Sequence, residues 1–99
     1  MKTIKRYASY VTVNNILKTE GYVPLKHHSV NINGRKQGFT GFFLNPRTGY
    51  VMYIATDITC CADTVMLRSA KSEHDYTGGH NEYCSNVEDL LSIAAKVTR

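Results

Sequence analysis

Cysteine and histidine side chains gather in the second half of the chain, where they could hold a metal ion. The cluster consists of Cys60, Cys61, His74, His80 and Cys84. Zinc is bound by thiolate and imidazole ligands, usually four of them in two closely spaced pairs. The adjacent cysteines make a poor chelating pair, and the chain has no Cys-x-x-Cys spacing. We therefore predict no metal and no cofactor, and His74, His80 and Cys84 stand only as weak zinc candidates.

Two further histidines could serve as an acid and a base. His27 and His28 are neighbours in a predicted strand, so their side chains point to opposite faces of the sheet. Together with His74 and Glu73, one of them could act in a metal-free ribonuclease. Nothing in the spacing forces these groups together. We therefore predict no catalytic residue, and we favour a protein that is not an enzyme.

Basic and aromatic side chains alternate through the predicted strands and turns. We expect seven of them to contact a partner or nucleic acid: Lys26, Arg35, Lys36, Phe42, Arg47, Tyr50 and Tyr53. Tyr22 is a further candidate for stacking. Single-stranded nucleic acids are bound by cations that meet phosphates and by rings that stack on bases. The same residues also suit a protein partner. A further alternative is that the basic residues in turns serve only to keep the protein soluble.

The charge is distributed unequally along the chain. Residues 1–50 contain eight lysines and arginines and one glutamate, a net charge of +7. Residues 51–99 contain four basic and seven acidic residues, a net charge of −3. A half-chain of +7 suits phosphates or an acidic protein surface, unless the two halves interleave in space.

Length and composition predict one globular domain that spans residues 1–99. Of the 99 residues, 42% are hydrophobic and 20% are charged, as in ordinary globular domains. No segment approaches the roughly 18 apolar residues that a membrane span needs, and no apolar segment follows the N-terminal charges. We therefore expect no membrane association, a cytoplasmic location and reduced cysteines.

An amphipathic helix is predicted from about Ser9 to Glu20. Its apolar residues recur at i, i+3, i+6 and i+7: Tyr10, Val13, Ile16 and Leu17. Ser9 or Thr12 can cap its start, and Gly21 suits the left-handed position after its end.

Two turn signals predict two hairpins. Asn33-Gly34 favours a type I′ turn that folds Lys26–Ile32 back on Arg35–Phe39. The segment Asn45-Pro46-Arg47-Thr48-Gly49 predicts a second turn, which joins Gly38–Leu44 to Tyr50–Thr56.

The second hairpin is apolar on both faces. A loop over Pro46–Gly49 pairs Leu44 with Val51 and Phe42 with Tyr53. One face then carries Phe42, Leu44, Val51, Tyr53 and Ala55. The other face carries Phe39, Phe43, Met52 and Ile54. Because two helices cover only one face well, we expect the first set to dock a protein partner or a second copy of the chain. The alternative is that the loop 72–83 folds back over it.

The remaining elements complete an α+β fold. Asp63–Ala70 is a predicted fourth strand, Ser72–Tyr83 a polar loop, and Ser85 with Glu88 a capping box at the start of a C-terminal helix. The apolar face of this helix consists of Val87, Leu90, Leu91, Ala94 and Ala95. We expect an antiparallel meander of three or four strands, with an N-terminal and a C-terminal helix packed on one face.

The segment from Ile16 to Ile54 resembles the HicA-type toxin ribonucleases. A helix ends in Leu-Lys-x-x-Gly-aromatic at residues 17–22, and the hairpin contains Lys-Gln-Gly-x-x-x-Phe-Phe at residues 36–43. The resemblance implies the α-β-β-β-α topology of double-stranded RNA-binding domains and an RNA-facing surface. The family places its catalytic histidine two residues after the glycine, where this chain has Thr40. The segment from Gly21 to Gly38 is also longer than its counterpart, and no catalytic residue is carried over.

Together these observations favour a small, non-enzymatic binding protein. We expect a regulator or inhibitor of the accessory type encoded by phages and mobile elements, acting through a protein partner or as a homodimer. The alternative is an RNA-binding module or a weak ribonuclease of the double-stranded RNA-binding or HicA-like fold. Steep salt dependence of RNA binding would favour that alternative.

Overall fold

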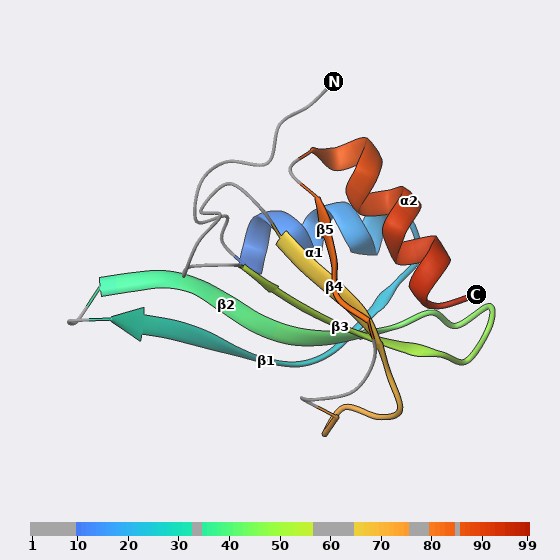
Figure 1. The fold of residues 1–99 in the computed structure, drawn as a ribbon, viewed down its shortest axis with the longest axis horizontal. Helices are drawn as coiled ribbons and strands as arrows, with labels where there is room; N and C mark the ends of the chain where they lie inside the picture. Colours follow the sequence, from blue (N-terminus) through green and yellow to red (C-terminus); the bar gives the residue numbers. More distant parts are fainter. Residues whose placement is uncertain (1–9, 33–34, 57–64, 76–79, 85) are drawn as a thin grey trace.

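The fold is a five-stranded antiparallel sheet with both helices on one of its faces (Figure 1). The computed structural model describes residues 10–32, 35–56, 65–75, 80–84 and 86–99. In chain order, these residues form α1 (Tyr10–Thr19), β1 (Val23–Ile32), β2 (Arg35–Leu44), β3 (Val51–Thr56), β4 (Val65–Ala70), β5 (Glu82–Cys84) and α2 (Val87–Val97). The strands follow one another in the sheet as β1-β2-β3-β4-β5. The predicted α+β meander with terminal helices is thus confirmed.

The first helix ends as its sequence predicts. Gly21 adopts a left-handed backbone conformation with φ of +96°. Its N–H donates to the carbonyl of Lys18 over 2.9 Å, and the Tyr22 N–H donates to the carbonyl of Leu17 over 3.0 Å. These two bonds form a Schellman motif, which satisfies carbonyls that the helix leaves free. Tyr22 and Leu17 both pack into the core, so the motif also directs the chain into β1.

Both predicted hairpins are present, and β2 is the strand that they share. Ile32 pairs with Arg35, so two residues separate β1 from β2. The predicted pairs of the second hairpin, Leu44 with Val51 and Phe42 with Tyr53, are both formed. Asn33 and Gly34 themselves lie outside the described residues.

A β-bulge interrupts β1, a feature that the sequence did not indicate. Pro24 pairs with Phe43, and His27 pairs with Gly41. Residues 25 and 26 therefore share the position opposite Phe42, as in a bulge. The pairing shifts again between Val30 and Asn31.

The sheet has five strands rather than the predicted three or four. Glu82 and Tyr83, expected in a loop, belong to β5, which pairs with β4 from Val65–Cys84 to Leu67–Glu82. A strand of three residues is too short to show alternation in the sequence. The predicted fourth strand is confirmed over Val65–Ala70, whereas residues 63 and 64 lie outside the described residues.

Two details of the C-terminal helix differ from expectation. The N-cap is Asn86 rather than Ser85, and its side-chain Oδ1 accepts from the Asp89 N–H over 2.8 Å. The overlapping Ser-x-x-Glu and Asn-x-x-Asp patterns differ by one residue, and the backbone selects the second. Leu90 and Ala94 are buried as expected, but Ala95 is exposed, and Ile93 and Val97 pack against the core instead.

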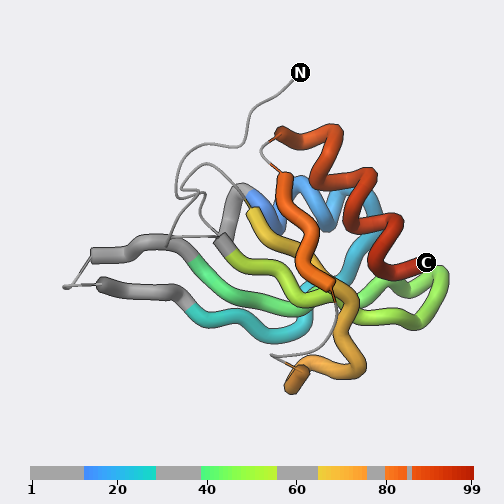
Figure 2. Tube along the Cα trace, in the orientation of Figure 1, coloured from blue at the N-terminus to red at the C-terminus, as the bar shows by residue number. Residues whose placement is uncertain are grey.

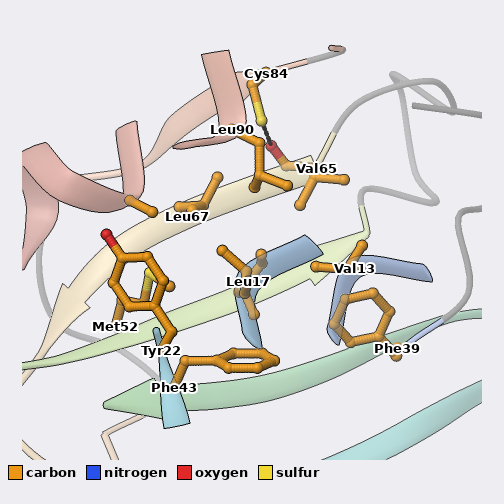
Figure 3. Close-up of a cluster of buried hydrophobic side chains, with 12 residues drawn as sticks. Val13, Leu17, Tyr22, Phe39, Phe43, Met52, Val65, Leu67, Cys84 and Leu90 are labelled. Atoms are coloured by element: carbon orange, nitrogen blue, oxygen red, sulfur yellow. Dashed lines mark hydrogen bonds between the residues drawn. The ribbon is translucent and has the colours of Figure 1, made fainter. Parts of the chain in front are cut away.

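The main core lies between the sheet and the two helices (Figure 3). Val13 and Leu17 of α1 and Leu90 and Ala94 of α2 contribute from the helices. The sheet contributes all four residues predicted for this face, which are Phe39, Phe43, Met52 and Ile54. Neither helix in the described part of the chain is long and apolar enough to cross a membrane.

Candidate functional site

The face of the sheet that the helices leave uncovered carries a row of alternating charge and aromatic rings. It runs across four strands through Lys26 of β1, Phe42 of β2, Tyr53 of β3 and Arg68 of β4. Phe42 pairs with Tyr53, and Tyr53 pairs with Arg68. The bulge in β1 brings Lys26 to the position opposite Phe42. We call these four residues the transverse row and this side of the sheet the open face.

Side-chain geometry shows that the transverse row is in contact throughout. The Lys26 Nζ lies 6.0 Å from the centre of the Phe42 ring. The rings of Phe42 and Tyr53 are tilted by 59°, with their centres 5.1 Å apart. The Arg68 Cζ lies 4.1 Å above the centre of the Tyr53 ring. Both ends of the row are therefore cation–π contacts, and both rings are covered by protein.

The predicted exposure of this face is wrong for its central residues. Phe42 is 1% exposed, Tyr53 is 8% exposed, and Ala55 is also buried. They form a second apolar cluster, against which Val51, Met66 and Ala70 pack. The predicted sides of Phe42, Val51, Tyr53 and Ala55 are correct, but the central side chains are covered within the chain itself.

The turn that follows β4, residues 71–75, supplies part of this cover. The Lys26 Nζ lies 2.9 Å from the His74 Nδ1, a contact between residues 48 positions apart. Because β2 and β3 separate β1 from β4, His74 reaches Lys26 only by crossing the open face. Figure 2 shows this segment on the side of the sheet opposite the helices. The alternative in which the loop folds back over the second face is therefore supported for residues 71–75.

Arg68 is the least satisfied polar side chain of the open face. It is 6% exposed, and its Nε and Nη2 atoms are buried without a hydrogen-bond partner in the described part of the chain. A buried cation is normally paired, because an unpaired one is strongly unfavourable. Sequence reasoning missed Arg68. The available signal was a charged residue between Met66 and Ala70, at the apolar positions of a strand.

A groove of about 420 Å³ opens beside this row, where β3 begins and β4 ends. It is lined by Gly49, Tyr50, Val51, Ser69, Ala70, Lys71 and Asp75. Tyr50 is 58% exposed, and the Lys71 side chain is exposed as well. β5 pairs with β4 only from Val65 to Leu67, so the edge of β4 beside the groove is not covered by β5. The groove thus offers an exposed ring beside two apolar side chains.

The predicted contact residues fall in separate places. Lys26, Phe42 and Tyr53 meet in the transverse row, and Tyr50 lines the neighbouring groove. Arg47 is exposed in the turn between β2 and β3. Arg35 and Lys36 occupy the first two positions of β2, about 30 Å along the strand from Leu44. Tyr22 is buried in the main core, so its predicted stacking role is wrong.

The structure separates the weak zinc candidates. Cys84 is buried in the main core, where its Sγ donates to the Val65 carbonyl over 3.6 Å. His74 belongs to the turn that crosses the open face, and His80 is exposed before β5. Among the described residues, no three histidine, cysteine, aspartate or glutamate side chains converge as metal ligands do. Cys60 and Cys61 lie outside the described residues.

The suggested acid–base set is also divided. His27 pairs with Gly41, on the side of the sheet that faces the helices, whereas His28 pairs with Thr40 on the open face. The sheet therefore separates His27 from His74. Glu73 and His74 lie 4.0 Å apart, between their Oε1 and Nε2 atoms, with both side chains largely exposed. Among the described residues, the geometry therefore does not bring the suggested set together.

The two halves of the chain meet on the open face. β1 and β2 form one side of the sheet and contain Lys26, Arg35 and Lys36. β4, β5 and α2 form the other side, where acidic residues such as Glu82 and Glu88 alternate with the basic Arg68 and Lys96. The turn of residues 71–75, from the acidic half, reaches Lys26 of the basic half. The alternative in which the two halves interleave in space is therefore supported at this turn.

Comparison with protein-family models, curated proteins and solved structures finds no match for this chain. The candidate function therefore rests on the geometry of the open face.

Proposed function

We propose that this protein is a non-enzymatic binding protein whose open face receives an acidic segment of a protein partner. The observation that carries the proposal is the groove, whose lining includes the exposed Tyr50 together with Val51, Ala70 and Lys71. Exposed tyrosines next to apolar side chains are typical anchors of protein interfaces. Lys26 and Arg68 add positive charge on the same face, which favours an acidic partner.

The covering of the two central rings favours protein over single-stranded RNA. Sites for single-stranded nucleic acids present open aromatic faces on which bases stack. In this chain, Phe42 and Tyr53 are buried, and their rings face Lys26 and Arg68. The open face therefore has charge and an apolar groove, but its central rings are already covered and cannot stack on bases. A partner of this kind suits a regulator or an inhibitor.

RNA binding remains a second candidate because of the hairpin formed by β1 and β2. These strands pair as far as Ile32 and Arg35, whereas β3 pairs with β2 only from Thr40 to Leu44. The far part of the hairpin is thus a two-stranded ribbon with Arg35 and Lys36 in its sequence. Such ribbons fit nucleic-acid grooves, and their basic residues contact phosphates.

Fluorescence anisotropy with defined ligands tests the proposal. The ligands are a labelled ten-residue peptide of alternating glutamate and leucine, its lysine–leucine counterpart, and a ten-nucleotide oligouridine. We expect the acidic peptide to bind most tightly, and Tyr50→Ala to weaken it by about tenfold, as loss of an interface anchor does. Lys18→Met, which removes an exposed charge from α1, is the matched control and should change little.

Two results would overturn this proposal. One is that wild-type protein shows no preference for the acidic peptide over the basic one. The other is that oligouridine binds more tightly than the peptide, with an affinity that falls steeply as salt rises. The second result would establish the RNA-binding candidate, because release of counterions from phosphates produces that dependence.

A further inference from the structure

Arg68 has a hydrogen-bonding capacity that the folded chain does not use. A guanidinium carries five N–H donors, and those on Nε and Nη2 lie along one edge. Both atoms are buried without a partner among the described residues, although the guanidinium lies over Tyr53, with its Cζ 4.1 Å from the ring centre. The ring supports the cation from one side, but it supplies no acceptor along that edge. Among the described residues, this edge of Arg68 has no acceptor, so it suits an acceptor from a ligand.

We propose that Arg68 is the anchor of a carboxylate-binding site that receives an aspartate or glutamate side chain of the protein partner. This inference rests on the proposed function and names the chemical group recognised. The Nε–Nη2 edge of arginine binds a carboxylate through two parallel hydrogen bonds. The contact with the Tyr53 ring already orders the guanidinium, so Arg68 loses little conformational freedom when it binds the carboxylate.

The surroundings of Arg68 favour a protein carboxylate over the phosphates of a nucleic acid. Met66 and Ala70, two residues before and after Arg68 on the same face, pack against the apolar cluster. The neighbouring groove is lined by Val51 and Tyr50, which suit an apolar side chain of the partner. A peptide can place such a side chain beside its carboxylate, whereas a chain of phosphates has none to offer.

The turn of residues 71–75 lies on the same side of the sheet as the buried edge of Arg68, so we expect it to open when a carboxylate binds. The turn is closed on itself by Asp75, which accepts from the Lys71 N–H over 3.0 Å, and by Ser72, which accepts from the His74 N–H over 3.1 Å. The Lys26–His74 contact attaches the closed turn to β1, with Lys26 half-buried and His74 exposed. We expect loss of that contact to favour opening of the turn, because closure of the turn competes with the ligand.

The side-chain signal of Arg68 provides a direct test. In ¹⁵N-labelled full-length protein, the Nε–Hε resonance is followed while three probes are added separately. The probes are the glutamate–leucine peptide, inorganic phosphate and the oligouridine. We expect the peptide alone to shift the Arg68 resonance at saturation. We also expect Arg68→Met to weaken peptide binding at least about tenfold, whereas Lys18→Met leaves it nearly unchanged.

Two further variants separate a binding role from a structural one. Arg68→Lys retains the charge but lacks the two-donor edge, so it should also weaken the peptide, with a circular-dichroism spectrum like that of wild type. His74→Ala removes the contact that holds the turn closed, so it should strengthen peptide binding several-fold. Weaker binding after His74→Ala would show that the turn belongs to the binding surface, and the proposed opening would be wrong.

The outcomes distinguish this inference from the proposed function. If the peptide binds wild type but Arg68→Met and Arg68→Lys bind equally well, the carboxylate site is wrong and the binding function stands. If phosphate or oligouridine shifts the Arg68 resonance as the peptide does, the commitment to a protein carboxylate is wrong. If the peptide binds neither wild type nor any variant, both the site and the proposed function fail.

Discussion

Asn45, at the start of the turn between β2 and β3, donates its side-chain Nδ2 to the Thr98 Oγ1 at the end of α2 over 3.0 Å. Both residues are buried. Thr98 in turn donates to the Ala94 carbonyl over 2.7 Å, and the Asn45 Oδ1 accepts from the Arg47 N–H over 3.0 Å. Thr48 adds a hydrogen bond from its Oγ1 to the carbonyl of Thr98. One polar network therefore holds the C-terminal helix against the second hairpin and orders the turn beside Tyr50.

Asn45→Ala is expected to destabilise the fold by about 1–3 kcal/mol, because it leaves buried partners without hydrogen bonds. Thr98→Val should have an effect of similar size, since it keeps the shape but loses both hydroxyl bonds. Urea unfolding followed by circular dichroism measures the change. Asn81→Ala, at an exposed position, is the control and should remain within about 0.5 kcal/mol of wild type. Equal stability of Asn45→Ala and Asn81→Ala would show that the network contributes nothing.

Much of the fold follows from local sequence signals, but the Asn45–Thr98 network is a long-range contact that such signals do not predict. The turn of residues 45–49 predicts its own register, because proline and glycine restrict the backbone, and Leu44 does pair with Val51. The partner of the Asn45 side chain is 53 residues away, and nothing local indicates it. In the same way, β5 is too short to show a period, and its pairing depends on where β4 lies.

The candidate site could be predicted only in part. The alternation of the second hairpin correctly places Phe42 and Tyr53 on one face. The row that they form with Arg68 depends on the pairing of β3 with β4, which a longer connection determines. The approach of Lys26 depends on a bulge that no turn residue marks. Exposure of this face could not be predicted, since part of its cover comes from residues 71–75, which reach Lys26 from 48 positions away in the chain.

Gly21→Ala should destabilise the protein by about 1 kcal/mol or somewhat more. Gly21 has φ of +96°, a conformation that residues with a Cβ atom rarely adopt. No heavy atom outside its chain neighbours lies within 4 Å of an added Cβ, so the effect is one of backbone conformation rather than crowding. Thermal unfolding measures the loss. Gly21→Asn should lose less, because asparagine tolerates left-handed conformations better; an equal loss would contradict this explanation.

The Cys84 thiol is expected to be unreactive in the folded protein. Its pKa is raised to about 12, mainly by burial and in part by the nearby Asp89 carboxylate, while the hydrogen bond to Val65 acts in the opposite direction. The thiolate is the reactive form, so a rise from 9.0 lowers its population about a thousandfold at neutral pH. Alkylation by iodoacetamide, in a variant with Cys60→Ser and Cys61→Ser, should be slow until urea unfolds the chain. Rapid alkylation without urea would contradict the buried position.

The same shift predicts a loss of stability in alkaline solution. The folded state holds the Cys84 proton to a higher pH than the unfolded state, whose thiol titrates near 9.0. This contribution is complete below pH 9 and decreases as the pH rises from 9 toward 12. The midpoint temperature of wild type should therefore fall more steeply over that range than that of Cys84→Ala, measured by circular dichroism. Parallel curves for the two proteins would show that Cys84 does not contribute.

Phe42→Ala distinguishes a covered face from an interface that awaits a second molecule. Phe42 is 1% exposed, and its ring contacts Tyr53 and the Lys26 ammonium group. Its removal should therefore destabilise the isolated chain by about 3–5 kcal/mol, as loss of a buried phenylalanine does. Phe43→Ala, on the face that the helices cover, should lose a similar amount. Tyr83→Ala, at an exposed position of β5, should lose little.

Denaturant unfolding and sedimentation of the same three variants provide the measurement. If Phe42 is part of the fold, Phe42→Ala unfolds more readily than wild type at every protein concentration, and sedimentation finds no change in the assembly of the folded chain. If the ring instead lies between two copies of the chain, stability depends on protein concentration, and Phe42→Ala shifts a dimer to a monomer without unfolding it. The second result would show that the centre of the open face is an interface between two copies of the chain, as its apolar sequence suggests. Arg68 would then lie at the contact between the copies.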